Sequence, residues 1–161
     1  MSRGHVLVVS IILRLSSVES ALGVDVPAAK APSVESDQWE TYRTERGGFS
    51  IDVPVTWAIE EPVDARGVLI TTLTPPSGAA ITVMSQPGTS LNQGDDADLM
   101  NTHCTDVTVA ERPARTCLDT ISFNVSTTVV GSDHTYLITS NRRRVDQRIY
   151  DRVLASFRIL R

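Results

Sequence analysis

The chain has 161 residues and a formal net charge of −4. Hydrophobic residues make up 41% and charged residues 21%, a balance that is typical of one globular domain with its own core. Because general nucleic-acid-binding proteins carry a basic face, the acidic balance argues against a nucleic-acid partner.

Residues 1–23 have the pattern of an export signal. Arg3 belongs to a short polar region, Val6–Leu13 is an apolar stretch of eight residues, and the small residues Ala21 and Gly23 suit a cleavage site. A bilayer takes about 20 apolar residues to cross, so this stretch is too short for a membrane span. We therefore expect an exported protein, in the periplasm or outside the cell, with a cytoplasmic protein as the alternative.

The first folded element is predicted soon after a linker. Residues 24–38 are rich in Pro, Ala and Ser and lack periodicity, which indicates a flexible linker before a single domain at residues 39–161. Apolar and polar residues then alternate over 49–53, the pattern of a half-buried strand. Pro54 ends this strand, and Trp57 follows in a tight turn, where we expect it to fill the core.

A hairpin and a short helix are predicted next. Residues 68–86 predict the hairpin, because two β-rich runs flank the turn residues Pro75–Gly78. Residues 91–103 predict the helix, with Asp95 and Asp96 near its first turns, where carboxylates suit the helix dipole. The spacing of the acids lacks the Gly and Glu of an EF-hand loop, so we interpret them as a solvated helix start and expect no metal site.

The two cysteines flank a second predicted turn. If this turn is centred between Ala110 and Glu111, Cys104 and Cys117 face each other across two strands and could form a disulfide. Such a bond would close a loop of about 14 residues and stabilise the fold by roughly 3 kcal/mol on the chain-entropy model. It requires an oxidising compartment. The alternative is two buried free thiols; a metal site that uses the neighbouring His103 lacks a standard ligand spacing.

The last part of the chain predicts a second hairpin and a helix. The hairpin spans residues 121–140, turns at Gly131–His134 and carries a glycosylation sequon at Asn124, which matters only in a eukaryotic secretory pathway. Apolar residues then recur at steps of four over 145–157, the pattern of an amphipathic helix that packs on a sheet. We interpret the basic run Arg142–Arg144 as the solvated start of this helix, or as a site that grips a phosphate or an acidic partner.

Two segments of the chain resemble segments of a known family. Gly48–Trp57, a strand with a proline and a tryptophan after it, and Tyr150–Phe157, a helix that ends in Ser-Phe, are similar to the segments that open and close the domain in the PsbP and Mog superfamily. The resemblance covers residues 42–160. It implies an α+β fold, an α/β/α sandwich in which an antiparallel sheet of about six strands lies between helices.

The same resemblance implies binding or assembly rather than catalysis. Some members of the superfamily are extrinsic subunits that support a photosynthetic oxygen-evolving complex, one branch binds a small GTPase in nuclear import, and many bacterial relatives are exported. No residue here matches the partner-binding or ion-binding residues of the characterised branches, so none is transferred. We therefore expect an exported accessory domain without enzymatic activity.

Catalytic motifs are absent from the sequence, which has no Gly-x-Ser-x-Gly, no phosphate-binding loop and no His-Glu-x-x-His. We expect no cofactor and a protein partner that the sequence does not identify. Two alternatives stay open. One is an envelope hydrolase or small-molecule binder with a scattered site of Asp95, Asp96, His103 and His134. The other is an intracellular assembly factor, which requires a retained N-terminus and reduced cysteines.

The basic run supplies the candidate partner-binding site. Arg142, Arg143 and Arg144 are expected to lie near the tip of the second hairpin, at Asp133 and His134, if that hairpin folds as predicted. These residues would then form one end of the domain, and we expect this end to bind an acidic partner.

Overall fold

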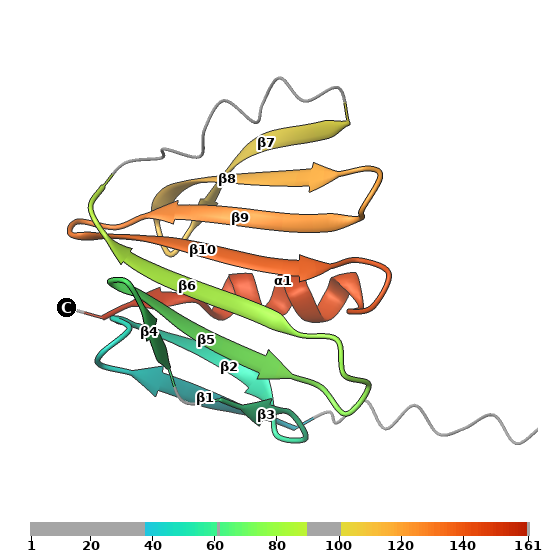
Figure 1. Cartoon of the computed structure of the whole chain (residues 1–161), viewed down its shortest axis with the longest axis horizontal. Coiled ribbons are helices and arrows are strands. Elements are labelled where there is room, and N and C mark those ends of the chain that lie inside the picture. The colour runs from blue at the N-terminus through green and yellow to red at the C-terminus, as the bar shows by residue number, and fades with distance from the viewer. Residues whose placement is uncertain (1–37, 61, 90–100, 161) are drawn as a thin grey trace, which may run out of the picture. The chain divides into compact units, whose positions relative to one another are not determined.

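The computed structural model describes residues 38–60, 62–89 and 101–160. Within these residues the chain forms two antiparallel sheets and one α-helix (Figure 1). The smaller sheet has the strand order β1-β2-β11, and the larger has the order β3-β5-β6-β10-β9-β8-β7, with β4 paired to β5. The elements are β1 (Trp39–Thr44), β2 (Phe49–Pro54), β3 (Ala58–Ile59), β4 (Val63–Ala65), β5 (Val68–Thr74), β6 (Ile81–Pro87), β7 (Thr102–Val109), β8 (Arg112–Asp119), β9 (Asn124–Val130), β10 (His134–Asn141), α1 (Gln147–Ser156) and β11 (Arg158–Ile159).

The predicted α/β/α sandwich, with about six strands between helices, is wrong. The described part of the chain is mostly strand, and its one helix has ten residues. Of the helix predicted at 91–103, residues 91–100 lie outside the described residues, while Thr102 and His103 already belong to β7. The β-branched Thr and Val residues of β7 favour a strand, and Thr102 and His103 pair with Asp119 and Leu118 of β8.

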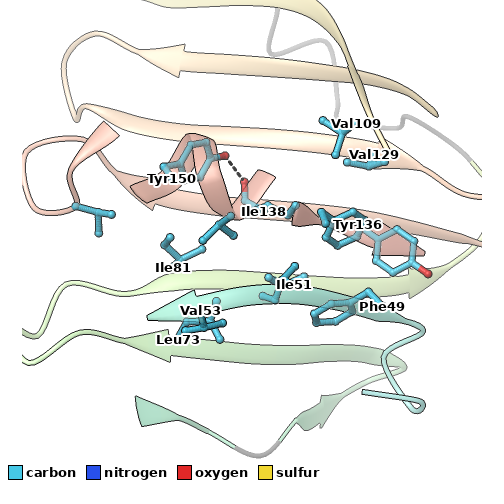
Figure 2. Packing of buried hydrophobic residues seen from close by; sticks show 14 of the residues in the cluster. Phe49, Ile51, Val53, Leu73, Ile81, Val109, Val129, Tyr136, Ile138 and Tyr150 are labelled. Atoms are coloured by element: carbon cyan, nitrogen blue, oxygen red, sulfur yellow. Dashed lines mark hydrogen bonds between the residues drawn. The ribbon is translucent and has the colours of Figure 1, made fainter. Parts of the chain in front are cut away.

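The core lies on one face of the large sheet. Val83 on β6 and Ile138 on β10 are opposite each other in register, and both are fully buried on this face. Ile51 and Val53 of β2 are buried in the same cluster (Figure 2). Both predicted hairpins, β5–β6 and β9–β10, form, and Trp57 is buried as expected, with 8% of its surface exposed.

The helix α1 begins at an aspartate cap. Asp146 Oδ1 accepts a hydrogen bond from the backbone N–H of Arg148 at 2.8 Å, which satisfies one of the free N–H groups of the first turn. The side-chain hydrogen bond from Arg148, followed by the backbone one, lowers the pKa of Asp146. The helix therefore begins at Gln147, and Arg142–Arg144 form an exposed turn before it instead of its first residues. No helix in the described part of the chain has the length and apolar character of a membrane span.

Three aromatic rings fix the end of α1 against both sheets. The Phe157 ring lies 5.7 Å from that of Phe49 in β2 and 5.3 Å from that of Tyr136 in β10, measured between centroids. Aromatic pairs of this kind are worth about 0.5–1.5 kcal/mol beyond the area they bury. The backbone N–H of Asp52 also donates to Ser156 Oγ at 2.9 Å. The helix thus packs on the same face of the large sheet as β2.

Candidate functional site

A cleft of about 400 Å³ lies between α1 and the β7–β8 hairpin. Side chains of β7 and β8 form one wall, those of α1 form the other, and Arg142 contributes from the turn before the helix. A second hollow of about 390 Å³ lies at the ends of β9 and β10, where Asn124 and Asn141 line it together with neutral side chains. The first cleft combines apolar, polar and charged groups, and we therefore treat it as the candidate site.

The hairpin wall is fixed by a turn and a disulfide. Ala110 and Glu111 form a two-residue turn with φ angles of 50° and 60°. The turn is centred where the sequence predicted it, and Cys104 is therefore paired with Cys117 in the β7–β8 register. The structure joins these two cysteines by a disulfide, with their Cα atoms 4.0 Å apart. Because positive φ angles are costly for residues other than glycine, this bond holds a hairpin whose turn is itself strained.

A chain of hydroxyl groups connects the hairpin wall to the helix. Thr116 Oγ1 lies 2.9 Å from Thr127 Oγ1, which lies 3.0 Å from the Tyr150 hydroxyl oxygen. The Tyr150 hydroxyl donates to the backbone carbonyl of Ile138 at 3.0 Å (Figure 2). Burial raises the pKa of Tyr150 to about 12, so its hydroxyl keeps its proton at neutral pH. These linked hydroxyl groups hold α1 at a fixed distance from the large sheet.

The half of the cleft near the start of α1 is polar. Arg142 lines it and forms no ion pair with another described residue. Gln147 Nε2 donates to Asp151 Oδ1 at 2.6 Å, whereas Gln147 Oε1 is buried and has no hydrogen-bond partner within the described residues. An unmatched buried acceptor costs about 1–3 kcal/mol, so a bound group that donates a hydrogen bond here would recover part of that cost.

The other half of the cleft is apolar. Val107 and Val109 of β7 line it together with Leu154 and Ala155 from the second half of α1. Val109 is buried, but Val107 keeps 36% of its surface exposed. Covering apolar surface of this kind contributes about 25 cal/mol for each Å² removed from water. The cleft therefore offers an apolar contact at one end and hydrogen-bonding and charged groups at the other.

The two histidines proposed for a hydrolase do not come together. His103 lies near the start of β7 and His134 at the start of β10, with β8 and β9 between the two strands. Across these strands the register aligns His103 with Ser140, six residues further along β10 than His134. Asp95 and Asp96 lie outside the described residues. Within the described residues, no three His, Cys, Asp or Glu side chains form a group that could hold a metal ion.

The arginine run and the hairpin tip also lie apart. The β9–β10 hairpin forms, but Asp133 and His134 precede β10 whereas Arg142–Arg144 follow its last residue, Asn141. At about 3.3 Å per residue, the length of β10 separates these groups by about 23 Å. The predicted convergence on one end of the domain is therefore wrong, because the two groups sit at opposite ends of the same strand.

The three arginines differ in their surroundings. Arg142 lines the cleft, and the Arg143 guanidinium lies 3.7 Å from the centroid of the Phe123 ring. The cleft residues Tyr150 and Val107 were not predicted as site residues from the sequence. Tyr150 sits on the apolar side of the predicted helix and Val107 in the alternating pattern of a predicted strand, but neither pattern shows that these two elements face each other.

Comparisons with known proteins show a structural likeness but no match in sequence. No family model matches the chain, and no curated protein matches it in sequence. Among solved structures, the chain is similar to cyanobacterial PsbP (CyanoP) from Synechocystis sp. PCC 6803, with 14% sequence identity and a TM-score of 0.49. The likeness covers 83% of this chain and 99% of that chain. The likeness concerns the fold alone.

Proposed function

We propose that this chain is an exported, non-enzymatic accessory domain that binds another protein through the cleft between α1 and β7–β8. The main support for this function is the cleft itself. It places the exposed side chain of Val107, the cation of Arg142 and the unmatched acceptor of Gln147 in one site. Apolar surface that is ringed by polar groups is typical of a surface that binds a partner.

The charge around the cleft favours an acidic partner. Residues 142–152, which include the turn before α1 and half of the helix, contain five arginines and two aspartates, although the whole chain has a net charge of −4. Electrostatic complementarity of this kind speeds association and selects partners more than it adds affinity. The arginine run is therefore part of the proposed binding surface, and Asp133 and His134 lie outside it.

Export is supported by two features of the chain. The first is the signal-like pattern of residues 1–23. The second is the disulfide between Cys104 and Cys117, since disulfides persist in oxidising compartments. The absence of an enzymatic role remains part of the proposal, and a saturable turnover in the purified protein would contradict it.

The test is affinity capture from the envelope fraction of the native host with matched variants. Val107→Glu places a charge in the apolar half of the cleft, whereas Val63→Glu does the same on β4, where the valine is 63% exposed. Both changes affect exposed valines, so both proteins should fold. We expect a partner that is captured by the wild type and by Val63→Glu but lost with Val107→Glu. A partner that both variants retain equally would contradict the proposed site.

The arginine run is tested in the same experiment. Replacing Arg142, Arg143 and Arg144 by serine should weaken capture, and the loss should be largest at low salt, where the wild-type protein gains most from charge. Unchanged capture would contradict an electrostatic contribution of these three arginines to partner binding.

A further inference from the structure

The strand β7 is a long and open edge of the large sheet. Among the described residues it pairs with β8 on one side and with no strand on the other. It has eight residues, and seven of them are at least partly exposed. Its sequence has no Lys, Arg or Pro, and its one carboxylate, Asp106, is already paired with Arg115 at 2.9 Å. Edge strands are commonly protected by Lys or Pro residues or by being short. β7 is long and has neither residue, and Asp106, whose side chain is 78% exposed, is its one acidic residue.

Other edges in the structure are different. β3, β4 and β11 have only two or three residues. β1 has six residues and carries two exposed charges, Glu40 and Arg43, whereas β7 carries one, Asp106. Charges on an edge oppose pairing with another strand. β7 is therefore the edge best suited to accept a further strand.

Every second residue of β7 directs its backbone N–H and C=O groups away from β8. Hydrogen-bonded and non-hydrogen-bonded pairs alternate along an antiparallel ladder, and residues of a non-hydrogen-bonded pair turn these groups outward. The Cα distance of 4.0 Å between Cys104 and Cys117 fits a non-hydrogen-bonded pair, for which about 4.5 Å is usual, rather than a bonded pair at about 5.5 Å. A two-residue turn is flanked by a hydrogen-bonded pair, here Val109 and Arg112, which gives the same alternation. Asp106, two residues after Cys104, shares its outward direction.

We propose that β7 accepts an extended segment of the partner protein as an additional strand of the large sheet. This inference rests on the proposed function, since the cleft lies along the same strand. A strand added to β7 continues the pleat, so every second side chain of the segment lies on the cleft face beside Val107. The segment that fits has apolar residues at alternate positions and a carboxylate that reaches Arg142. Main-chain hydrogen bonds supply affinity, and the cleft supplies specificity.

A partner segment fits this edge better than a second copy of the chain does. Pairing two copies through β7 would place two arginine-rich segments, residues 142–152 of each copy, on the same face of a continuous sheet. Like charges that are brought together in this way repel. An acidic partner segment instead neutralises the single arginine-rich segment.

The experiment uses the full-length wild type, Asp106→Pro and Asp106→Ala to select from a displayed library of random peptides of about ten residues. Asp106→Pro removes an outward N–H without removing a β7–β8 hydrogen bond, because only the inward residues bond to β8. Asp106→Ala keeps the N–H and removes the exposed ion pair with Arg115, so it is the matched control. We expect selected peptides with alternating apolar residues and an acidic residue. Their affinity should fall about tenfold or more for Asp106→Pro and no more than about twofold for Asp106→Ala.

A second measurement does not depend on how Asp106→Pro folds. In the wild type, the backbone amides of Cys104 and Asp106 should exchange hydrogen with solvent faster than those of Thr105 and Val107, which bond to β8. Addition of a selected peptide should slow the exchange at Cys104 and Asp106 in particular. Exchange that remains equally fast with saturating peptide would overturn strand addition.

The outcomes separate this inference from the proposed function. Peptides that bind Asp106→Pro as well as wild type but lose affinity for Val107→Glu would overturn strand addition and leave the cleft as the site. A selection that yields no peptide above background would overturn strand addition. The capture experiment with Val107→Glu would then decide whether the cleft binds a partner. If the wild type dimerises and Asp106→Pro abolishes the dimer, the edge of β7 binds a second copy of the chain. This result would also overturn the proposal that β7 binds a partner segment.

Discussion

Replacing Tyr150 by phenylalanine should test how α1 is held against the large sheet. The Tyr150 hydroxyl donates to the carbonyl of Ile138 at 3.0 Å and contacts Thr127 Oγ1 at 3.0 Å, and the residue is 2% exposed. Phenylalanine keeps the buried ring but removes both hydrogen bonds. Thr127 keeps its contact with Thr116, whereas the carbonyl of Ile138 loses a partner. We expect the free energy of unfolding to fall by about 1–2 kcal/mol at pH 7.

The same substitution should remove a specific pH dependence. Burial, the largest cause, raises the pKa of Tyr150 to about 12 in the folded protein, from about 10 in the unfolded chain. The stabilisation is therefore complete below pH 10 and is lost as the pH rises toward 12, at up to about 1.4 kcal/mol for each pH unit. Tyr150→Phe should be less sensitive over this range, so that its difference from wild type becomes smaller.

Urea denaturation at several pH values measures both effects. A double-mutant cycle with Thr127→Val isolates the contribution of the hydroxyl pair, because the two side chains are in direct contact. Tyr136, whose pKa is also raised by burial, stays in both proteins and contributes equally to them. Equal stability of wild type and Tyr150→Phe at pH 7, or an undiminished difference near pH 12, would refute this account of the helix wall.

Three further predictions concern the elements that form the cleft. Replacing Cys104 and Cys117 by serine should lower the free energy of unfolding by roughly 3 kcal/mol, and a reducing agent should destabilise the wild type but not this variant in urea denaturation. Glu111→Gly should raise the free energy of unfolding by about 0.5–1 kcal/mol, because glycine adopts the positive φ of the turn without strain; a lower melting temperature would contradict this. Asp146→Ala should cost about 1 kcal/mol at pH 7. The pKa of Asp146 is lowered in the folded protein, so its contribution is present above its ordinary pKa and the difference from wild type should disappear in acid, as thermal melts would show.

Local patterns in the sequence predicted the local structure well. The turn centred between Ala110 and Glu111 determined the β7–β8 register, and with it the pairing of Cys104 with Cys117. The alternation at residues 49–53 predicted a half-buried strand, and β2 is one. These features depend on neighbouring residues and on turn geometry, so a single sequence contains the information that they need.

Features that depend on how elements face each other were not predicted. The sandwich of helices was wrong because the described residues form one helix, and the β-branched residues of β7 extend the sheet instead. The arginine run and His134 were expected to converge, although a strand that joins two groups holds them apart by its own length. The cleft was missed because it requires α1 to pack on the face of the sheet to which β7 and β8 contribute.

The most direct test of the cleft as the binding site is photo-crosslinking in the native host. A photoreactive residue replaces Val107 in the cleft or, as the control, Val63 on β4, and the two full-length proteins are compared after illumination. We expect a crosslink to one partner protein from position 107 that is weaker when Arg142 is also replaced, and no such crosslink from position 63. The same crosslink from both positions, or a crosslink from position 63 alone, would contradict the cleft as the binding site.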